Sequence, residues 1–218
     1  AAPRVGVSGA GSWGTVLADL LATNGSSVEL WAYEREVVDQ IHAHRENRFF
    51  LPGIRLSPRL AASNDLAETA AGKDLLVVVV PSHVIRETMT ALAGRLDGKT
   101  SVVSASKGIE NQTHLTMTGV LKEVLTIADD RLAVLSGPSF AAEVAKKYPT
   151  VVTVASSNPA LARFAQQVFA TPYFRVYTCD DTIGVELGGS VKNVIAIAAG
   201  IVDGLGLGLN TRAALITR

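Results

Sequence analysis

Six residues near the start of the chain have the types and spacing to bind a pyrophosphate. Gly9-Ala10-Gly11-Ser12-Trp13-Gly14 forms a G-x-G-x-x-G motif between the apolar run Val5-Gly6-Val7 and a helical pattern that begins at Thr15. A strand that leads through a glycine turn into a helix directs backbone N–H groups and the positive helix end at an anion. The motif therefore indicates a dinucleotide site, and the alternative is a glycine-rich turn in an unrelated α/β protein.

An acid and a base follow the second expected strand, about 20 residues beyond the glycine turn, where a ribose would lie. Glu34 could accept the ribose hydroxyls of NAD, whereas Arg35 could pair with the 2′-phosphate of NADP. Tyr33 could flank the adenine. A solvated surface turn explains Glu34 or Arg35 equally well, so the sequence leaves the choice between NAD and NADP open.

Two lysines, Lys107 and Lys192, could take part in proton transfer. Lys107 lies in Ser106-Lys107-Gly108 after an expected strand, and Lys192 follows the small residues Gly188, Gly189 and Ser190 in an expected helix. Oxidation of an alcohol needs a base, and a lysine can serve if burial or a like charge lowers its pKa. Lys107 could be the charged neighbour of Lys192. The alternatives are a solvated loop lysine and a lysine that extends from an apolar helix to water.

Serines follow two other expected strands. Ser139 could offer a hydroxyl and a helix N-terminus to a polar ligand, and Ser82 could cap the helix that follows it. A plain helix cap explains either residue without any ligand. We therefore treat Ser139 as a candidate only because of its place in the expected sheet.

The elements that would position these residues form a doubly wound α/β pattern. Short β-branched runs alternate with helical patterns, which is typical of βαβ units and a mostly parallel, Rossmann-like sheet. We expect strands at residues 4–8, 27–31, 74–80, 100–105, 131–135, 151–155 and 174–177. We expect helices at residues 15–22, 84–96, 115–125, 141–146 and 160–169. Ligands of such sheets lie at the carboxyl ends of the strands, where the candidate residues other than Lys192 occur.

Two further segments differ from this pattern. Residues 47–58 are irregular and could form a lid or a surface excursion. After Asp180 we expect one long helix at residues 183–202 and a second at 211–217 that has barely begun where the chain stops. The predicted organisation is a cofactor-binding domain at residues 1–182, followed at 183–218 by the first helices of a truncated helical substrate domain.

Composition narrows the possible partners. The 218 residues contain 20 basic and 20 acidic side chains, so no overall field attracts nucleic acid or an anionic membrane. The apolar runs at 75–80 and 194–202 are shorter than the ~20 residues that span a bilayer, and the N-terminus does not resemble a signal peptide. We therefore expect a cytoplasmic protein. The lone Cys179 and four scattered histidines have no metal-ligand spacing, so no metal is expected.

Taken together, these motifs resemble the NAD(P)-dependent glycerol-3-phosphate dehydrogenase family from about Val5 to Arg218. The segments that carry the resemblance are Gly9-Ala10-Gly11-Ser12-Trp13-Gly14, Leu30-Trp31, Val79-Val80-Pro81-Ser82, Ser106-Lys107-Gly108-Ile109-Glu110, Ser136-Gly137-Pro138-Ser139-Phe140-Ala141 and Val191-Lys192-Asn193-Val194-Ile195-Ala196-Ile197. The segments around Lys107 and Lys192 are more specific than the glycine motif.

The resemblance implies a reaction and a set of roles. Members of the family reversibly reduce dihydroxyacetone phosphate to sn-glycerol 3-phosphate, which supplies phospholipid synthesis. Lys192 matches the catalytic lysine, which exchanges a proton with the C2 oxygen of the substrate, and Lys107 matches a second lysine that contacts cofactor and substrate. The remaining matches are Gly137, Ser139 and Asn193 for the substrate and Ser12, Trp13, Tyr33 and Ala141 for the cofactor.

The resemblance also implies what this chain would lack. The family's helical second domain supplies an arginine–asparagine pair for the substrate phosphate and an acidic residue near the catalytic lysine. We expect both to be missing here, so that the chain alone is inactive or nearly so. A full-length member is expected to be a homodimer.

Two other functions stay open at this stage. The first is a non-catalytic module that binds or senses NAD(P)H. The second is a dehydrogenase of the same architecture that acts on another acid or sugar phosphate, and Ser106-Lys107-Gly108 argues against it.

Overall fold

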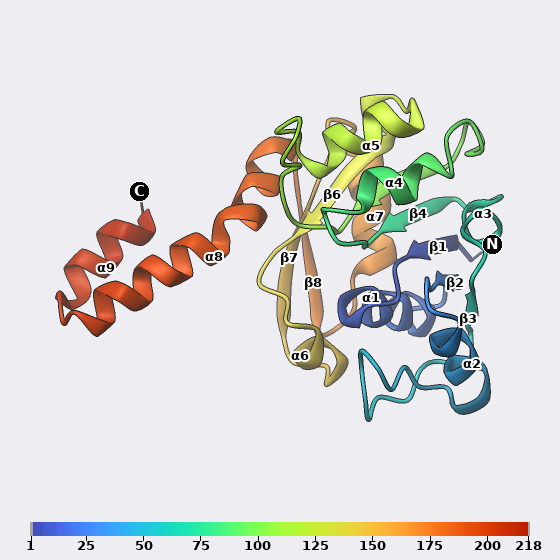
Figure 1. Cartoon of the computed structure of the whole chain (residues 1–218), viewed down its shortest axis with the longest axis horizontal. Coiled ribbons are helices and arrows are strands. Elements are labelled where there is room, and N and C mark those ends of the chain that lie inside the picture. The colour runs from blue at the N-terminus through green and yellow to red at the C-terminus, as the bar shows by residue number, and fades with distance from the viewer. Residues whose placement is uncertain (1, 218) are drawn as a thin grey trace.

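The computed structural model describes residues 2–217, so Ala1 and Arg218, the outer limits of the two predicted domains, lie outside the described residues. An eight-stranded sheet forms the centre of the α/β body, from which α8 and α9 extend (Figure 1). Its strands are β1 (Arg4–Ser8), β2 (Ser27–Trp31), β3 (Leu60–Ser63), β4 (Leu75–Val78), β5 (Ser101–Ser104), β6 (Leu132–Ser136), β7 (Thr150–Ala155) and β8 (Phe174–Cys179). The helices are α1 (Ser12–Thr23), α2 (Arg35–His44), α3 (Leu66–Ala70), α4 (Ile85–Thr90), α5 (Met117–Leu125), α6 (Ala141–Ala145), α7 (Pro159–Phe169), α8 (Thr182–Gly204) and α9 (Gly208–Thr217).

The strand order creates a crevice at one edge of the sheet. The order is β3-β2-β1-β4-β5-β6-β7-β8, and neighbouring strands are parallel except for the antiparallel pair β6 and β7. The chain runs outward from β1 to β3 and then crosses to β4 on the other side of β1. Strand order therefore reverses between β1 and β4, and in such sheets ligands bind outside the carboxyl ends at this point.

Helices cover both faces of the sheet and bury its apolar residues. In β4, Leu75 and Val77 pack into the cluster that contains α1, α2, α6 and α7. Leu76 and Val78 point to the opposite face and pack with α3, α4 and α5. This alternation is the period-2 pattern of a strand buried on both sides, and it explains why the parallel strands are almost wholly apolar.

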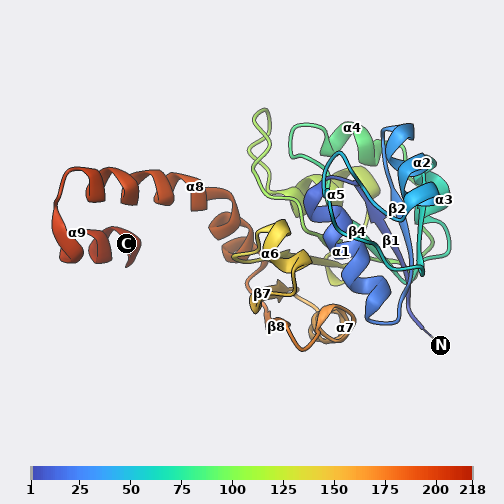
Figure 2. The same cartoon turned by 90° about the horizontal axis from the view of Figure 1, so that it is seen from below.

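Helix α8 leaves the α/β body and carries α9 at its far end (Figures 1 and 2). Its first turns pack on β6 and β7, and the buried carboxylate of Glu186 accepts hydrogen bonds from the amide and hydroxyl of Thr118. Beyond this contact, apolar side chains such as Val194, Ile197 and Ile201 are exposed.

The length and mean hydropathy of α8 match those of a membrane span, and the helix is longer than the apolar run at residues 194–202. Length and hydropathy alone are weak evidence for a membrane span, because core helices of soluble proteins share these two properties. Lys192 lies near the middle of the helix, where a charged side chain would cost about 3 kcal/mol in a bilayer.

The predicted fold class is confirmed, and several elements differ from expectation. The structure adds β3, α2 and α3, which the sequence pattern did not predict. Strand β3 is a four-residue edge strand with a single neighbour, so its alternation is too short to detect. The helix expected at 84–96 ends at Thr90, and turns follow it that include Gly94 in a left-handed conformation.

Candidate functional site

A groove of about 1130 Å³ lies at the carboxyl edge of the sheet, where strand order reverses. It joins the glycine turn after β1 to the segments that follow β2, β4 and β5. Its lining includes Gly9, Gly11, Ser12, Trp13, Gly14, Tyr33, Glu34, Phe50, Val80, His83, Lys107 and Ser139. The groove therefore brings together nine of the residues predicted from the sequence, drawn from four separate segments.

The glycine turn has the shape of a phosphate cradle. A Cβ on Gly14 would overlap the carbonyl oxygen of Gly9, so α1 can start this close to β1 only with glycine at position 14. A Cβ on Gly11, by contrast, would meet nothing within 4 Å. Because α1 begins at Ser12, its free N–H groups lie beside this open space. The space and the donors fit a pyrophosphate.

Alanine at positions 11 and 14 is expected to have opposite consequences. Gly11→Ala should leave the thermal midpoint unchanged and weaken NADH binding about tenfold, because the new methyl occupies space meant for the ligand. Gly14→Ala should destabilise the fold by about 1–3 kcal/mol, because its methyl meets backbone. Nicotinamide fluorescence and thermal unfolding measure the two effects. Normal NADH affinity in a folded Gly11→Ala variant would contradict the cradle.

The irregular segment 47–58 supports this turn. Asn47 is fully buried, and its side-chain amide donates to the carbonyl of Ala10 at 2.8 Å and to Oγ1 of Thr15 at 2.9 Å. Ser12 in turn donates its hydroxyl to the carbonyl of Phe50 at 2.5 Å. The segment therefore packs against the glycine turn and brings Phe50 to the groove, a contribution that the sequence reasoning missed.

The end of β2 contributes Tyr33 and Glu34 to the groove but not Arg35. The Tyr33 ring is exposed and lies edge-on to Trp31, with centroids 6.5 Å apart. Arg35 is the first residue of α2 and faces solvent, with Nε 3.9 Å from a carboxylate oxygen of Asp39. The arrangement places an acid, but no basic side chain, on the groove wall at this end.

Lys107 and Lys192 lie close together beyond the ends of β5 and β6. Lys107 is half-buried and donates from Nζ to the carbonyl of Gly137 at 3.2 Å. Burial lowers the pKa of Lys107, and the positive charge of Lys192 lowers it further. Lys192 is exposed on α8, with Nζ 5.7 Å from the ring centroid of Phe140. A small polar substrate between the two ammonium groups would meet a concentrated positive charge.

Small residues let α8 approach the sheet edge and bring Lys192 to this position. A Cβ on Gly189 would lie 2.5 Å from the hydroxyl of Ser136, so a larger residue here would force the Ser136 side chain to move. The next residue, Ser190, accepts a hydrogen bond from the amide of Gly108 at 3.1 Å. The helix is therefore attached directly to the loop that carries Lys107.

Other predicted site residues occupy different positions. Ser139 lines the groove but does not cap α6, because α6 begins at Ala141 and the Ser139 hydroxyl donates to the carbonyl of Gly137 at 3.2 Å. Ser82 does not cap α4 either, since Val84 precedes its first residue. Ala141 is partly buried against the core and is not among the residues that line the groove, and Asn193 is exposed next to Lys192.

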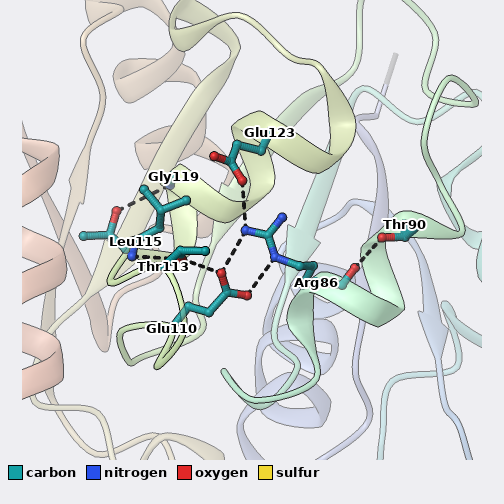
Figure 3. A network of polar contacts seen from close by, with 8 residues as sticks. Arg86, Thr90, Glu110, Thr113, Leu115, Gly119 and Glu123 are labelled. Atoms are coloured by element: carbon teal, nitrogen blue, oxygen red, sulfur yellow. Dashed lines mark hydrogen bonds and ion pairs between the residues drawn. The ribbon is translucent and has the colours of Figure 1, made fainter.

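The loop that carries Lys107 ends in an ion-pair network that joins it to α4 and α5 (Figure 3). Arg86 on α4 donates to both carboxylate oxygens of Glu110, at 2.9 and 2.8 Å, and to Glu123 at 2.9 Å. Thr113 also donates its hydroxyl to Glu110. The Arg86 guanidinium and the Thr113 hydroxyl hold the pKa of Glu110 at about 2, well below its usual range.

This network should make stability fall in acid. The folded chain binds the Glu110 proton more weakly than the unfolded chain, in which the pKa of a glutamate is about 4.3. The contribution of Glu110 is therefore complete above that value and is lost as pH falls toward 2. The difference in thermal midpoint between wild type and Glu110→Gln should shrink between about pH 6 and about pH 3. A difference that stays constant over this range would contradict the assignment.

Comparison with known proteins identifies the family. The model for the N-terminus of NAD-dependent glycerol-3-phosphate dehydrogenase matches residues 4–162, and the model for its C-terminus matches residues 181–218. The chain belongs to this family. The first match covers strands β1 to β7 and the residues that line the groove, and the second begins just before α8 and includes Lys192.

Relatives within the glycerol-3-phosphate dehydrogenase family are close. The chain is 56% identical over 218 residues to glycerol-3-phosphate dehydrogenase (NAD(P)+) of Citrifermentans bemidjiense, covering 100% of this chain and 65% of the relative. It is 57% identical over 216 residues to the enzyme of the same name from Geobacter sulfurreducens, covering 99% of this chain and 64% of that relative. The chain thus spans about 65% of the length of the relatives it matches.

A solved structure of a glycerol-3-phosphate dehydrogenase has the same fold. The crystal structure of the Coxiella burnetii protein superposes with a TM-score of 0.87 at 42% identity, covering 99% of this chain and 66% of that one. The family therefore has this sheet and this connection into α8 in an experimentally determined member.

Proposed function

We propose that the chain is the cofactor-binding part of an enzyme that interconverts dihydroxyacetone phosphate and sn-glycerol 3-phosphate with NAD(P)(H). The observation that carries the proposal is the single groove that runs from the glycine turn to Lys107, with Lys192 beside Lys107. The names of the close relatives support the reaction. Its product is a precursor for phospholipid synthesis, as the family resemblance implies.

The groove residues have distinct tasks in binding the cofactor. Gly9, Gly11 and Gly14 and the first N–H groups of α1 would hold the pyrophosphate. Tyr33 and Glu34 would contact the adenosine end, with Arg35 at the rim, and Ser12, Trp13 and Ala141 would complete the site. The bound nicotinamide supplies or accepts the hydride.

The two lysines would act on the substrate. Lys192 donates a proton to the C2 oxygen during reduction and takes it back during oxidation. Lys107 contacts both cofactor and substrate, and its charge favours the oxygen as it gains negative charge. Gly137, Ser139 and Asn193 would line the remaining substrate surface. None of these steps needs a metal ion.

The same proposal extends to the domains, the cellular location and the partners of the protein. Residues 1–182 would form the cofactor domain and residues 183–218 the start of the helical substrate domain. The protein would act in the cytoplasm on a small-molecule substrate, as a homodimer at the length of its relatives, with no nucleic-acid or membrane partner. Since the relatives are longer, the phosphate of the substrate would be held by residues beyond this match.

Cofactor binding by this chain tests the first half of the proposal. Titration with NADH and with NADPH, followed by nicotinamide fluorescence, should give saturable binding in both cases or in one of them. Absence of binding at millimolar concentrations of both cofactors would refute the assignment of the groove.

A further inference from the structure

We propose that Arg86 and Glu110 are positioning residues that hold the loop Ser106–Glu110 so that Lys107 faces the groove. The inference rests on the proposed function, because it concerns the lysine that would contact cofactor and substrate. Neither residue lines the groove, so the pair would act through the backbone of the loop.

The loop is attached to the body at three points along its length. At its start, the hydroxyl of Ser106 donates to the carbonyl of Val80 at 2.6 Å. In the middle, the amide of Gly108 donates to Ser190 on α8. At its end, both oxygens of Glu110 are bound by Arg86, and Glu110 is only 9% exposed. Lys107 lies between the first two attachments.

Arg86 connects this loop to the neighbouring wall of the groove. It lies on α4 between Val84 and Glu87, whose side chains line the groove, while its guanidinium points to Glu110 (Figure 3). The pair thus ties together the segments that follow β4 and β5, which are adjacent strands. A planar guanidinium bound to both carboxylate oxygens fixes orientation as well as distance, which a single hydrogen bond does not do.

The same loop also contacts the helix that carries Lys192. Ser190, which binds the amide of Gly108, donates its own hydroxyl to the carbonyl of Glu186 at 2.8 Å. The side chain of Glu186 is in turn held by Thr118 at the start of α5. A shift of the loop would therefore change the position of Lys107 relative to both the groove and Lys192.

A second ion pair of similar geometry provides the control. Arg4 binds Asp74 through its amide and its guanidinium, at the amino ends of β1 and β4 and thus at the opposite edge of the sheet. Asp74→Asn should lose an arginine–carboxylate pair without altering Lys107. Any effect that Glu110→Gln shares with Asp74→Asn reflects general stability.

Kinetics in a protein with the length of its relatives test the positioning role. Glu110→Gln should lower kcat/KM for dihydroxyacetone phosphate about tenfold, since small misplacements at a reacting site are costly. Asp74→Asn should leave it unchanged. Because Glu110 acts only through Lys107, the Glu110→Gln, Lys107→Ala double variant should match Lys107→Ala within about twofold. A further tenfold loss in the double variant, or wild-type kcat/KM in Glu110→Gln, would overturn the proposal.

Hydrogen exchange in this chain tests the same idea without any reaction. The amides of Gly108 and Glu110 are hydrogen-bonded to Ser190 and to the carbonyl of Leu115. In Glu110→Gln the peptide that covers residues 106–116 should exchange about tenfold faster than in wild type, with no change in Asp74→Asn. Equal exchange in all three proteins would refute the positioning role even if the enzyme reduces dihydroxyacetone phosphate. Faster exchange in an enzyme without that activity would refute only the proposed function.

Discussion

Lys192→Ala is expected to lower kcat for the reduction of dihydroxyacetone phosphate by about 10²–10⁴-fold, the usual effect of removing a general acid or base. The variant keeps the glycine turn and the groove lining, to which Lys192 does not belong. The affinity for NADH should therefore stay within about twofold of wild type. Steady-state kinetics in a protein with the length of its relatives, together with a fluorescence titration, measure both quantities.

A lysine elsewhere on the surface controls for the loss of charge. Lys122 on α5 pairs with Asp129 at 2.7 Å and does not line the groove. Lys122→Ala should leave kcat and the NADH affinity unchanged. If Lys192→Ala also retained nearly normal turnover, Lys192 would have no role as the acid–base group.

Lys107→Ala is expected to weaken binding of cofactor and substrate together. The variant loses an ammonium group that lines the groove, and hydrogen bonds to charged groups contribute about 1.5–3 kcal/mol each. The KM for dihydroxyacetone phosphate and the Kd for NADH should each rise by about 10–100-fold. Steady-state kinetics and the fluorescence titration described for Lys192→Ala measure both constants.

Lys107→Met separates the charge from the packing of the side chain. Methionine retains an unbranched apolar stem of similar length, so the half-buried part of the side chain stays filled. Lys107→Met should therefore be more stable than Lys107→Ala and bind NADH and substrate equally poorly. Wild-type constants in either variant would remove Lys107 from the site.

The centre of the sheet could be predicted from the sequence because its strands are buried on both faces. Runs such as Leu75–Val78 are continuously apolar, and a predicted helix follows this one. The edge could not be predicted in the same way. Strand β3 has four residues, and helix α3 has five, so neither repeats its period often enough to be recognised.

The site could be predicted in part for a similar reason. The spacing of the glycines was sufficient to predict the glycine turn. Lys107 could be predicted because it directly follows an expected strand, at the edge of the sheet where ligands bind. The supporting contacts involve residues far apart in the chain, such as Asn47 with Ala10 or Glu186 with Thr118, and no local pattern marks them. The unexpected role of Ser139 has the same origin, because its partner is the carbonyl of Gly137 and not a helix amide.

The most direct test of the account is the oxidation of NADH and of NADPH by a protein of this sequence at the length of its relatives, with and without dihydroxyacetone phosphate. The account predicts a loss of nicotinamide absorbance that requires dihydroxyacetone phosphate, yields one sn-glycerol 3-phosphate per cofactor oxidised and disappears in Lys192→Ala. Tight cofactor binding with no oxidation on addition of dihydroxyacetone phosphate would contradict the account and favour a module that only binds NAD(P)H.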